Sequence, residues 1–196
     1  MRYGDSVKDG AATVSVGSIA QPQAGAQGRF DARDLEHLFA QTFAERYDTV
    51  LCGGAEEPFY QPGQPGQPHR ILYTRDYFRS ALHEVAHWCV AGAARRQQAD
   101  YGYWYAPDGR DAVQQQAFEQ VEVRPQALEL LFCEACGHPF AVSLDNLNGE
   151  TGDATAFAAA VAAQAARYRE QMRNQRWARW LHTLTGFYQP GKKLSG

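Results

Sequence analysis

The pentapeptide His83-Glu84-Val85-Ala86-His87 carries the side chains best suited to chemistry in this 196-residue chain. On a helix, residues four apart lie on one face, so the two imidazoles can reach a single ion. A divalent metal at a catalytic site needs neutral nitrogens, a carboxylate and an open coordination position. The spacing therefore predicts a helix that supplies two metal ligands, His83 and His87. The alternative is two ordinary histidines on a helix.

The third ligand must come from elsewhere in the chain. The extended zinc-peptidase motif would place glycine at Val90 and histidine at Ala93, and the sequence has neither. Glu119 and Glu122, on the next predicted helix, are the strongest candidates. They are three residues apart and can share a face, so spacing alone does not separate them. Two histidines and one carboxylate suit both non-haem Fe(II) oxygen chemistry and zinc hydrolysis.

Glu84 is the predicted catalytic residue of the motif, and its role depends on the reaction. In a zinc peptidase it would act as the general base that deprotonates a metal-bound water. In a hydroxylase it could orient the ligands or relay a proton. Both roles stay open from the sequence.

A second candidate metal motif is Cys133-Glu134-Ala135-Cys136, followed by His138. The chain lacks the second CxxC pair that a zinc site of this kind would need. Four cysteines are also too few and too scattered for a disulfide scaffold. We therefore expect Cys133 and Cys136 to be half-buried thiols near a helix end.

The elements around the histidine motif can be read from hydrophobic spacing and breaker residues. A helix from about Tyr77 to Arg96 is expected to carry the motif, with the arginines at its C-terminal end. Two short strands should precede it, at 49–52 and 70–74, separated by a proline-rich loop. Gly53-Gly54 is expected to end the first strand.

The chain before these strands divides into a head and a first helix. Residues 1–28 are rich in small and polar side chains and cannot bury enough surface to order themselves, so we expect disorder there. A helix should begin near Phe30, capped by Asp31 or Asp34. Residues 29–190 are expected to form a single domain.

The second half of the chain reads as helical. Residues 111–136 have helical spacing, and Pro125 is expected to kink or split that helix. An alanine-rich helix at about 154–172 follows, and then a helix with Trp177 and Trp180 on one face, which we expect in the core.

Composition narrows the class of protein. A formal net charge of −3 does not call for nucleic acid or an anionic membrane as a partner. The sequence has no apolar run of the ~18 residues that span a bilayer, and its start does not read as a secretory signal. A cytoplasmic location follows as the expectation.

Several long blocks resemble the signature regions of the elongation factor P hydroxylase family. They are the segments at 80–92 (SALHEVAHWCVAG), 100–111 (DYGYWYAPDGRD) and 118–128 (FEQVEVRPQAL), extended by LLFC at 130–133 and SLDNL at 143–147. They cover roughly residues 33–148 in matching order. Several blocks in register are far more specific than the two histidines alone.

The resemblance implies an α+β fold, helix-rich with a small β-sheet, similar to HExxH metalloproteins. It also implies a metal, most simply Fe(II), held by His83, His87 and a carboxylate matching Glu122. The implied reaction is hydroxylation of a lysine on translation elongation factor P after a lysyl group has been attached to it. A zinc-dependent minimal peptidase and a non-catalytic module that binds the factor are the competing interpretations.

A lysine-type substrate would need a carboxylate partner or aromatic faces in a partly dry pocket. Asp108, Asp111 and Glu119 are the candidate partners, and Tyr105, in the aromatic loop 101–105, is a candidate pocket wall. The alternative is that the loop only anchors a turn at Pro107-Asp-Gly.

Overall fold

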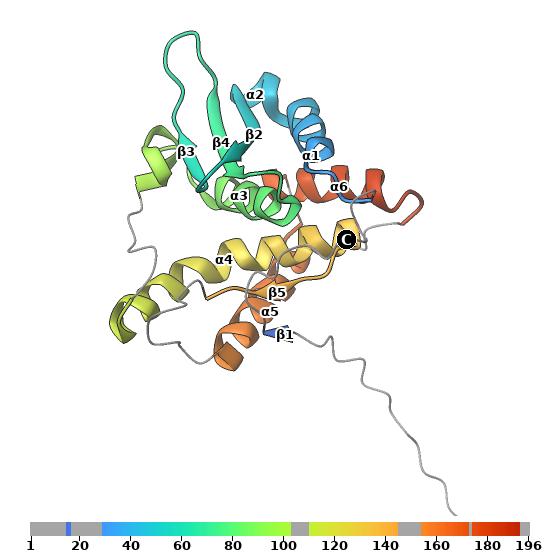
Figure 1. The fold of residues 1–196 in the computed structure, drawn as a ribbon. Helices are drawn as coiled ribbons and strands as arrows, with labels where there is room; N and C mark the ends of the chain where they lie inside the picture. Colours follow the sequence, from blue (N-terminus) through green and yellow to red (C-terminus); the bar gives the residue numbers. More distant parts are fainter. Residues whose placement is uncertain (1–14, 17–28, 103–109, 145–153, 173, 193–196) are drawn as a thin grey trace, which may run out of the picture.

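A computed structural model of the chain describes residues 15–16, 29–102, 110–144, 154–172 and 174–192. A small sheet and the first helix lie on one side of the central helix α3 (Phe78–Val90), and α4 (Ala112–Cys136) crosses on its other side (Figure 1). The predicted helix-rich α+β fold with a small sheet is confirmed.

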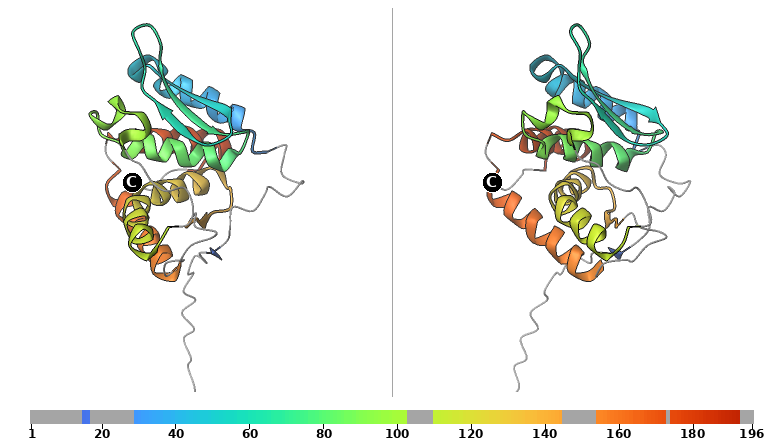
Figure 2. Two further views of the ribbon diagram at one scale, coloured as in Figure 1. Left: turned by 60° about the vertical axis from the view of Figure 1, so that its left-hand side comes forward. Right: turned by 90° about the vertical axis from the view of Figure 1, so that its left-hand side faces the viewer.

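The main sheet has the strand order β2-β4-β3, with β2 at Thr49–Ala55, β4 at His69–Thr74 and β3 at Phe59–Gln61. β2 and β4 run parallel, and β3 pairs antiparallel with β4 along its other edge. The connection between β3 and β4 extends away from the helices (Figure 2). β3 was missed by sequence reasoning because prolines flank its three residues.

Gly53-Gly54 does not end β2, as the sequence had suggested, but lies inside it at a β-bulge. A Cβ atom on Gly53 would lie 2.5 Å from the carbonyl oxygen of Arg75 and 2.7 Å from the ring of Tyr73. Gly54 has a φ of +91°, a conformation that side chains other than glycine rarely adopt. The glycines therefore allow a close approach and a bulge without breaking the strand.

The first helical segment comprises α1 (Ala32–Phe39), a π-helical turn (Ala40–Ala44) and α2 (Glu45–Tyr47). Of the two predicted caps, Asp31 is the one used, because its side chain accepts a hydrogen bond from Arg33 N. α1 packs on β2 and α3, so it covers one side of the helix that bears the motif.

α3 ends at Val90, earlier than the predicted end near Arg96. At this end, arginine side chains donate hydrogen bonds to a backbone carbonyl oxygen that the next helical turn would otherwise have bonded. Arg96 Nη1 donates to Ala91 O at 2.7 Å, and Arg176 Nη2 donates to the same oxygen at 2.5 Å. Two short 3₁₀ turns follow, at Arg95–Gln97 and Ala99–Gly102.

α4 is one continuous helix across Pro125, so the expected split does not occur. A proline inside a helix costs roughly 3 kcal/mol because it removes one hydrogen bond and crowds the preceding turn. α4 packs against α3, α5 and α6, and this burial outweighs the cost. It begins with a capping box between Asp111 and Gln114 and ends at Gly137, whose φ is +71°.

The two C-terminal helices, α5 (Ala154–Glu170) and α6 (Arg176–Tyr188), confirm the predicted helices of the tail. Figure 2 shows α5 lying along α4. Trp177 and Trp180 are buried in the core, as predicted, and Trp180 contacts the rings of Phe39 and Phe43.

Two of the residues expected to be disordered, Ser15 and Val16, form β1, which pairs in parallel with β5 (Ala141–Val142). The rest of the predicted disordered head, residues 1–14 and 17–28, lies outside the described residues.

Candidate metal centre

α3 presents both histidines of the motif toward α4. Phe78, Leu82, Val85 and Cys89 are buried on the helix, which fixes the face on which His83 and His87 project. Their Nε2 atoms are 3.0 Å apart. Two imidazoles thus converge on one point from consecutive turns, as the i, i+4 spacing predicts.

α4 brings a carboxylate to the same point. Glu122 is 3% exposed, its Oε1 lies 3.2 Å from His87 Nε2, and its Oε2 lies 3.6 Å from His83 Nε2. One atom from each of the three side chains falls within 4.8 Å of the others. Within the described residues this is the one such group of histidine, cysteine and acidic side chains, and it contains Glu122 rather than Glu119.

The spacing of these donors fits a first-row divalent metal. Ligand atoms at about 2.1 Å from an ion lie roughly 3.0 Å apart at right angles and roughly 3.4 Å apart at tetrahedral angles. The observed separations of 3.0, 3.2 and 3.6 Å run from the lower end of that interval to slightly beyond its upper end. Two imidazole nitrogens and one carboxylate, on helices that are packed together, are also the donor types such ions prefer.

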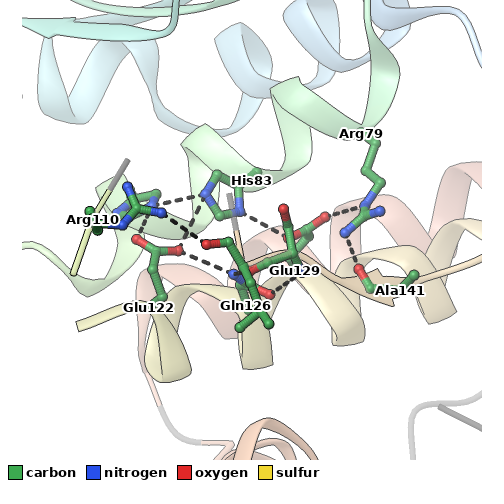
Figure 3. A network of polar contacts seen from close by, with 10 residues as sticks. Arg79, His83, Arg110, Glu122, Gln126, Glu129 and Ala141 are labelled. Carbon is green, nitrogen blue, oxygen red and sulfur yellow. Dashed lines mark hydrogen bonds and ion pairs between the residues drawn. The ribbon is translucent and has the colours of Figure 1, made fainter. Parts of the chain in front are cut away.

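A second carboxylate fixes the orientation of His83. His83 Nδ1 lies 2.9 Å from Glu129 Oε2, and Arg79 Nε donates to Glu129 Oε1 at 2.5 Å. Arg79 also donates to the carbonyl oxygen of Ala141 on β5. Figure 3 shows this network next to His83. A proton on Nδ1 facing Glu129 leaves the Nε2 lone pair directed at Glu122, which is the tautomer a metal requires.

Gln126 links Glu122 to the chain beyond α4. Its side-chain amide donates to Ser143 O at 2.7 Å and accepts from Ser143 N at 2.9 Å. The same amide nitrogen lies 3.5 Å from Glu122 Oε2. Glu129 and Gln126, the polar side chains that contact His83 and Glu122, are themselves buried, so they can hold these two candidate ligands in position.

The electrostatic field at the centre favours a cation. Burial alone would lower the pKa of His83, but its hydrogen bond to Glu129 and the charges of Glu129, Glu122 and Glu84 raise it to about 10. Burial alone would raise the pKa of Glu122, but His87, His83 and Gln126 lower it to about 2. The carboxylates thus stabilise positive charge at the imidazoles. A metal ion bound between the imidazoles would bring positive charge to the same place.

Glu84 lies beside the same group, and it is 8% exposed. Burial raises its pKa, against the opposing charges of His87 and His83. Among the described residues, the structure gives its carboxylate no hydrogen-bond donor. Such a group can take up or release a proton next to the candidate ligands.

Of the four predicted substrate residues, Asp108 and Tyr105 lie outside the described residues. Asp111 caps α4 by accepting the N–H of Gln114 at 2.8 Å. Glu119, one turn before Glu122, accepts a hydrogen bond at 3.1 Å from a glutamine side chain on the same helix. A role of these residues toward substrate stays a prediction.

Sequence reasoning missed the residues that support the centre, although spacing offered a signal. Glu122, Gln126 and Glu129 recur at i, i+4 and i+7 and form a polar stripe on an otherwise buried face of α4. Arg79 stands four residues before His83 on α3. Charged side chains on one buried face of two neighbouring helices indicate a polar network between them.

A cavity of about 560 Å³ opens beside His87. Its walls are the segment at 90–95 after α3, Tyr101, and the first half of α4. The α4 residues are Gln120, Val121, Arg124 and Pro125. A cavity of this size accommodates a small molecule or a long side chain that enters from a partner.

The cysteines of the other sequence motif do not belong to this group of candidate ligands. Cys133 and Cys136 are free thiols in the core, more deeply buried than the expected half-buried pair.

None of the helices among the described residues combines the length and apolar character needed to cross a membrane.

Fold and site together define a helix-rich α+β protein with a candidate metal centre of two histidines and one carboxylate between α3 and α4. A family model described as elongation factor P hydroxylase matches residues 38–195. A curated Haemophilus influenzae protein named "Elongation factor P lysine hydroxylase" is 44% identical over 156 residues, which are 79% of this chain and 88% of the relative. The chain belongs to the elongation factor P hydroxylase family.

Proposed function

We propose that this protein hydroxylates a lysine of elongation factor P with the help of a divalent metal, iron, bound by His83, His87 and Glu122. The substrate form would be the factor whose lysine already carries a lysyl group. The convergence of the three side chains within 4.8 Å, in a chain that belongs to this family, is the observation that supports the proposal. Fe(II) with free coordination positions would supply oxygen activation.

The side chains around the centre have separate tasks in this proposal. Glu129 keeps the proton of His83 on Nδ1, so that Nε2 stays free for the ion. Gln126 holds the Glu122 carboxylate toward the two imidazoles. Glu84 carries a proton to or from the reacting group, since its carboxylate is buried beside the ligands without a fixed donor among the described residues.

The cavity next to His87 is the proposed entry path for the modified lysine side chain. It lies between the end of α3 and the first half of α4, so a long side chain that enters it points at His87. A surface loop of the substrate protein could insert its modified lysine there while the substrate protein stays folded.

The competing function, a zinc-dependent peptidase, has one observation against it. A peptidase must hold an extended peptide, commonly by adding it to an exposed strand edge. Tyr60 N, on the edge strand β3, points away from β4 and donates to Asp100 Oδ1 at 2.8 Å. The Tyr101 ring also stacks on the Tyr60 ring, with centroids 4.3 Å apart. The outward N–H of Tyr60 on the β3 edge is therefore already paired and is not free to bind a peptide.

Substitution of Glu84 by glutamine, with activity measured both as substrate-dependent oxygen consumption and as peptide hydrolysis, separates the two functions. A peptidase loses its general base and nearly all activity. For the hydroxylase, we expect Glu84→Gln to reduce oxygen consumption less than His83→Ala does, because oxygen is activated at the metal. Peptide hydrolysis by the zinc-loaded protein, with no oxygen consumption by the iron-loaded protein, would instead support the peptidase.

A further inference from the structure

The wall of the cavity beside His87 carries two arginines that no step above uses. Arg95 belongs to the segment after α3 and Arg124 belongs to α4, so they come from the two segments between which the cavity lies. Both residues are exposed, whereas Ala91 and Tyr101 of the same wall are buried. The two guanidinium groups therefore face solvent at the opening of the cavity, where a side chain would enter.

Each of these arginines donates to a neutral oxygen. Arg95 Nη1 donates to the carbonyl oxygen of Tyr101 at 3.0 Å, and Arg124 Nε donates to the Tyr168 hydroxyl at 3.3 Å. A neutral acceptor holds a guanidinium in place without cancelling its charge. In the described part of the chain, neither Nη atom of Arg124 contacts an acceptor, so the outer edge of that guanidinium can bind a partner.

The described lining of the cavity has no acidic side chain that would offset these charges. None of the described residues in its wall is an aspartate or a glutamate. Glu119 directly precedes Gln120, which lines the cavity, but the Glu119 carboxylate accepts a hydrogen bond from Gln115 at 3.1 Å on the same helix. The opening therefore attracts negatively charged groups.

Two more arginines lie behind the same wall. Arg96 Nη1 and Arg176 Nη2 both donate to the carbonyl oxygen of Ala91, a residue of the lining. Within the described ranges, neither guanidinium forms an ion pair with a carboxylate. Their hydrogen bonds to the end of α3 explain their position, and their charges add to the positive potential at the opening.

This opening fits carboxylates on the surface of a protein. A guanidinium binds a carboxylate through two parallel hydrogen bonds. Because Arg95 and Arg124 flank whatever enters the cavity, the groups that they meet are those beside the inserted side chain. The chain as a whole has a formal net charge of −3, so the positive potential is local and differs from the broad basic surface of a nucleic-acid-binding domain.

We propose that Arg95 and Arg124 form a docking contact for acidic side chains of the substrate protein that lie beside its modified lysine. The inference rests on the proposed function for the identity of the substrate protein. Such a contact speeds the encounter and orients the substrate protein so that its lysine faces the cavity. Because the arginines bind the protein around the lysine, they help to determine which protein presents a side chain to the centre.

The test variant replaces both arginines by glutamine, which removes two charges and keeps polar side chains. The matched control is the double variant Arg70→Gln, Arg179→Gln, because both arginines are exposed, on β4 and α6, and neither lines the cavity. The double variant Arg95→Lys, Arg124→Lys keeps both charges. Thermal unfolding shows whether each variant keeps its fold. If the glutamine double variant does not, Arg124→Gln alone replaces it, since Arg124 makes a single hydrogen bond within the described residues.

The first readout is binding of lysylated elongation factor P to the zinc-loaded protein, which requires no turnover. At about 50 mM salt, where screening is weak, the glutamine variant should bind the factor roughly twofold to thirtyfold more weakly than the natural protein, as expected for two exposed charge pairs. The loss should lie mainly in the association rate, and it should shrink as salt is added. The lysine variant and the control should stay close to the natural protein. Equal affinity of the glutamine variant and the natural protein at low salt overturns the inference.

The second readout is the kinetics of the iron-loaded enzyme on the same factor. The glutamine variant should raise KM by a similar factor and leave kcat within about twofold. If the natural protein hydroxylates the factor and the glutamine variant has the same KM, the inference fails while the proposed function stands. If the factor binds through the two arginines but is never hydroxylated, the proposed function fails and the docking contact stands. If the glutamine variant loses binding of bulk tRNA while its affinity for the factor is unchanged, the arginines serve nucleic acid and the inference is overturned.

Discussion

Glu129→Gln should impair metal binding although Glu129 touches no metal. In the native protein one carboxylate oxygen accepts from Arg79 Nε at 2.5 Å and the other faces His83 Nδ1 at 2.9 Å. Glutamine offers only one acceptor oxygen. If that oxygen faces Arg79, the amide N–H faces His83 Nδ1, so the imidazole must carry its proton on Nε2, where the ion should bind. If the oxygen faces His83, the amide N–H faces the Arg79 guanidinium, donor against donor, and that hydrogen bond is lost.

The two alternatives set the expected losses of metal affinity and of stability. Loss of a carboxylate that orients a metal-binding histidine typically costs about tenfold to a hundredfold in metal affinity. Loss of a charged hydrogen bond to Arg79 should also lower the free energy of unfolding by roughly 1.5–3 kcal/mol. For a chain of this size, each kcal/mol lowers Tm by about 2–4 °C.

Metal affinity can be measured by competition with a chromophoric chelator, using zinc or iron. Glu134→Gln is the matched control, because Glu134 also lies on α4 and pairs with an arginine, Arg169, but both side chains are 46% exposed. That variant should bind metal like the native protein. Native-like affinity in Glu129→Gln would refute the role assigned to Glu129.

Three other substitutions test the site and its frame. Glu122→Gln should lower metal affinity, whereas Glu119→Gln should retain it and alter only substrate turnover; chelator competition would expose the reverse order. Gly53→Ala should lower Tm, because its Cβ would lie 2.5 Å from a carbonyl oxygen, whereas Gly186→Ala, with open space around it, should not. Arg176→Met removes donors to the terminal carbonyls of α3 and should lower Tm by roughly 2–12 °C, at about 1–3 kcal/mol. An unchanged Tm in thermal unfolding would show that the hydrogen bonds from Arg176 do not stabilise the end of α3.

The helices of the fold were largely predictable, because each has a long apolar stripe. The sequence predicted α5, α6 and the start of α1, with a cap at Asp31 or Asp34 of which the structure uses Asp31. Three details depended on tertiary contacts that no local pattern reveals. α3 stops at Val90 where arginines from distant segments bind its carbonyls, α4 continues across Pro125 under the packing of its neighbours, and β2 continues through Gly53-Gly54.

The candidate centre was predictable in part. His83 and His87 followed from their spacing, whereas Glu122 followed from the family resemblance and could not be separated from Glu119 by periodicity. Glu129 was not foreseen, because it reaches His83 from two turns beyond Glu122 on α4.

The mass of lysylated elongation factor P after incubation with the purified protein tests the central claim most directly. The iron-loaded protein should add the mass of one oxygen atom to the factor, and the zinc-loaded protein should add nothing, because zinc occupies the same ligands without an accessible redox step. His83→Ala loaded with iron should also add nothing. An unmodified factor with the iron-loaded native protein, or equal modification with the His83→Ala variant, would contradict the account.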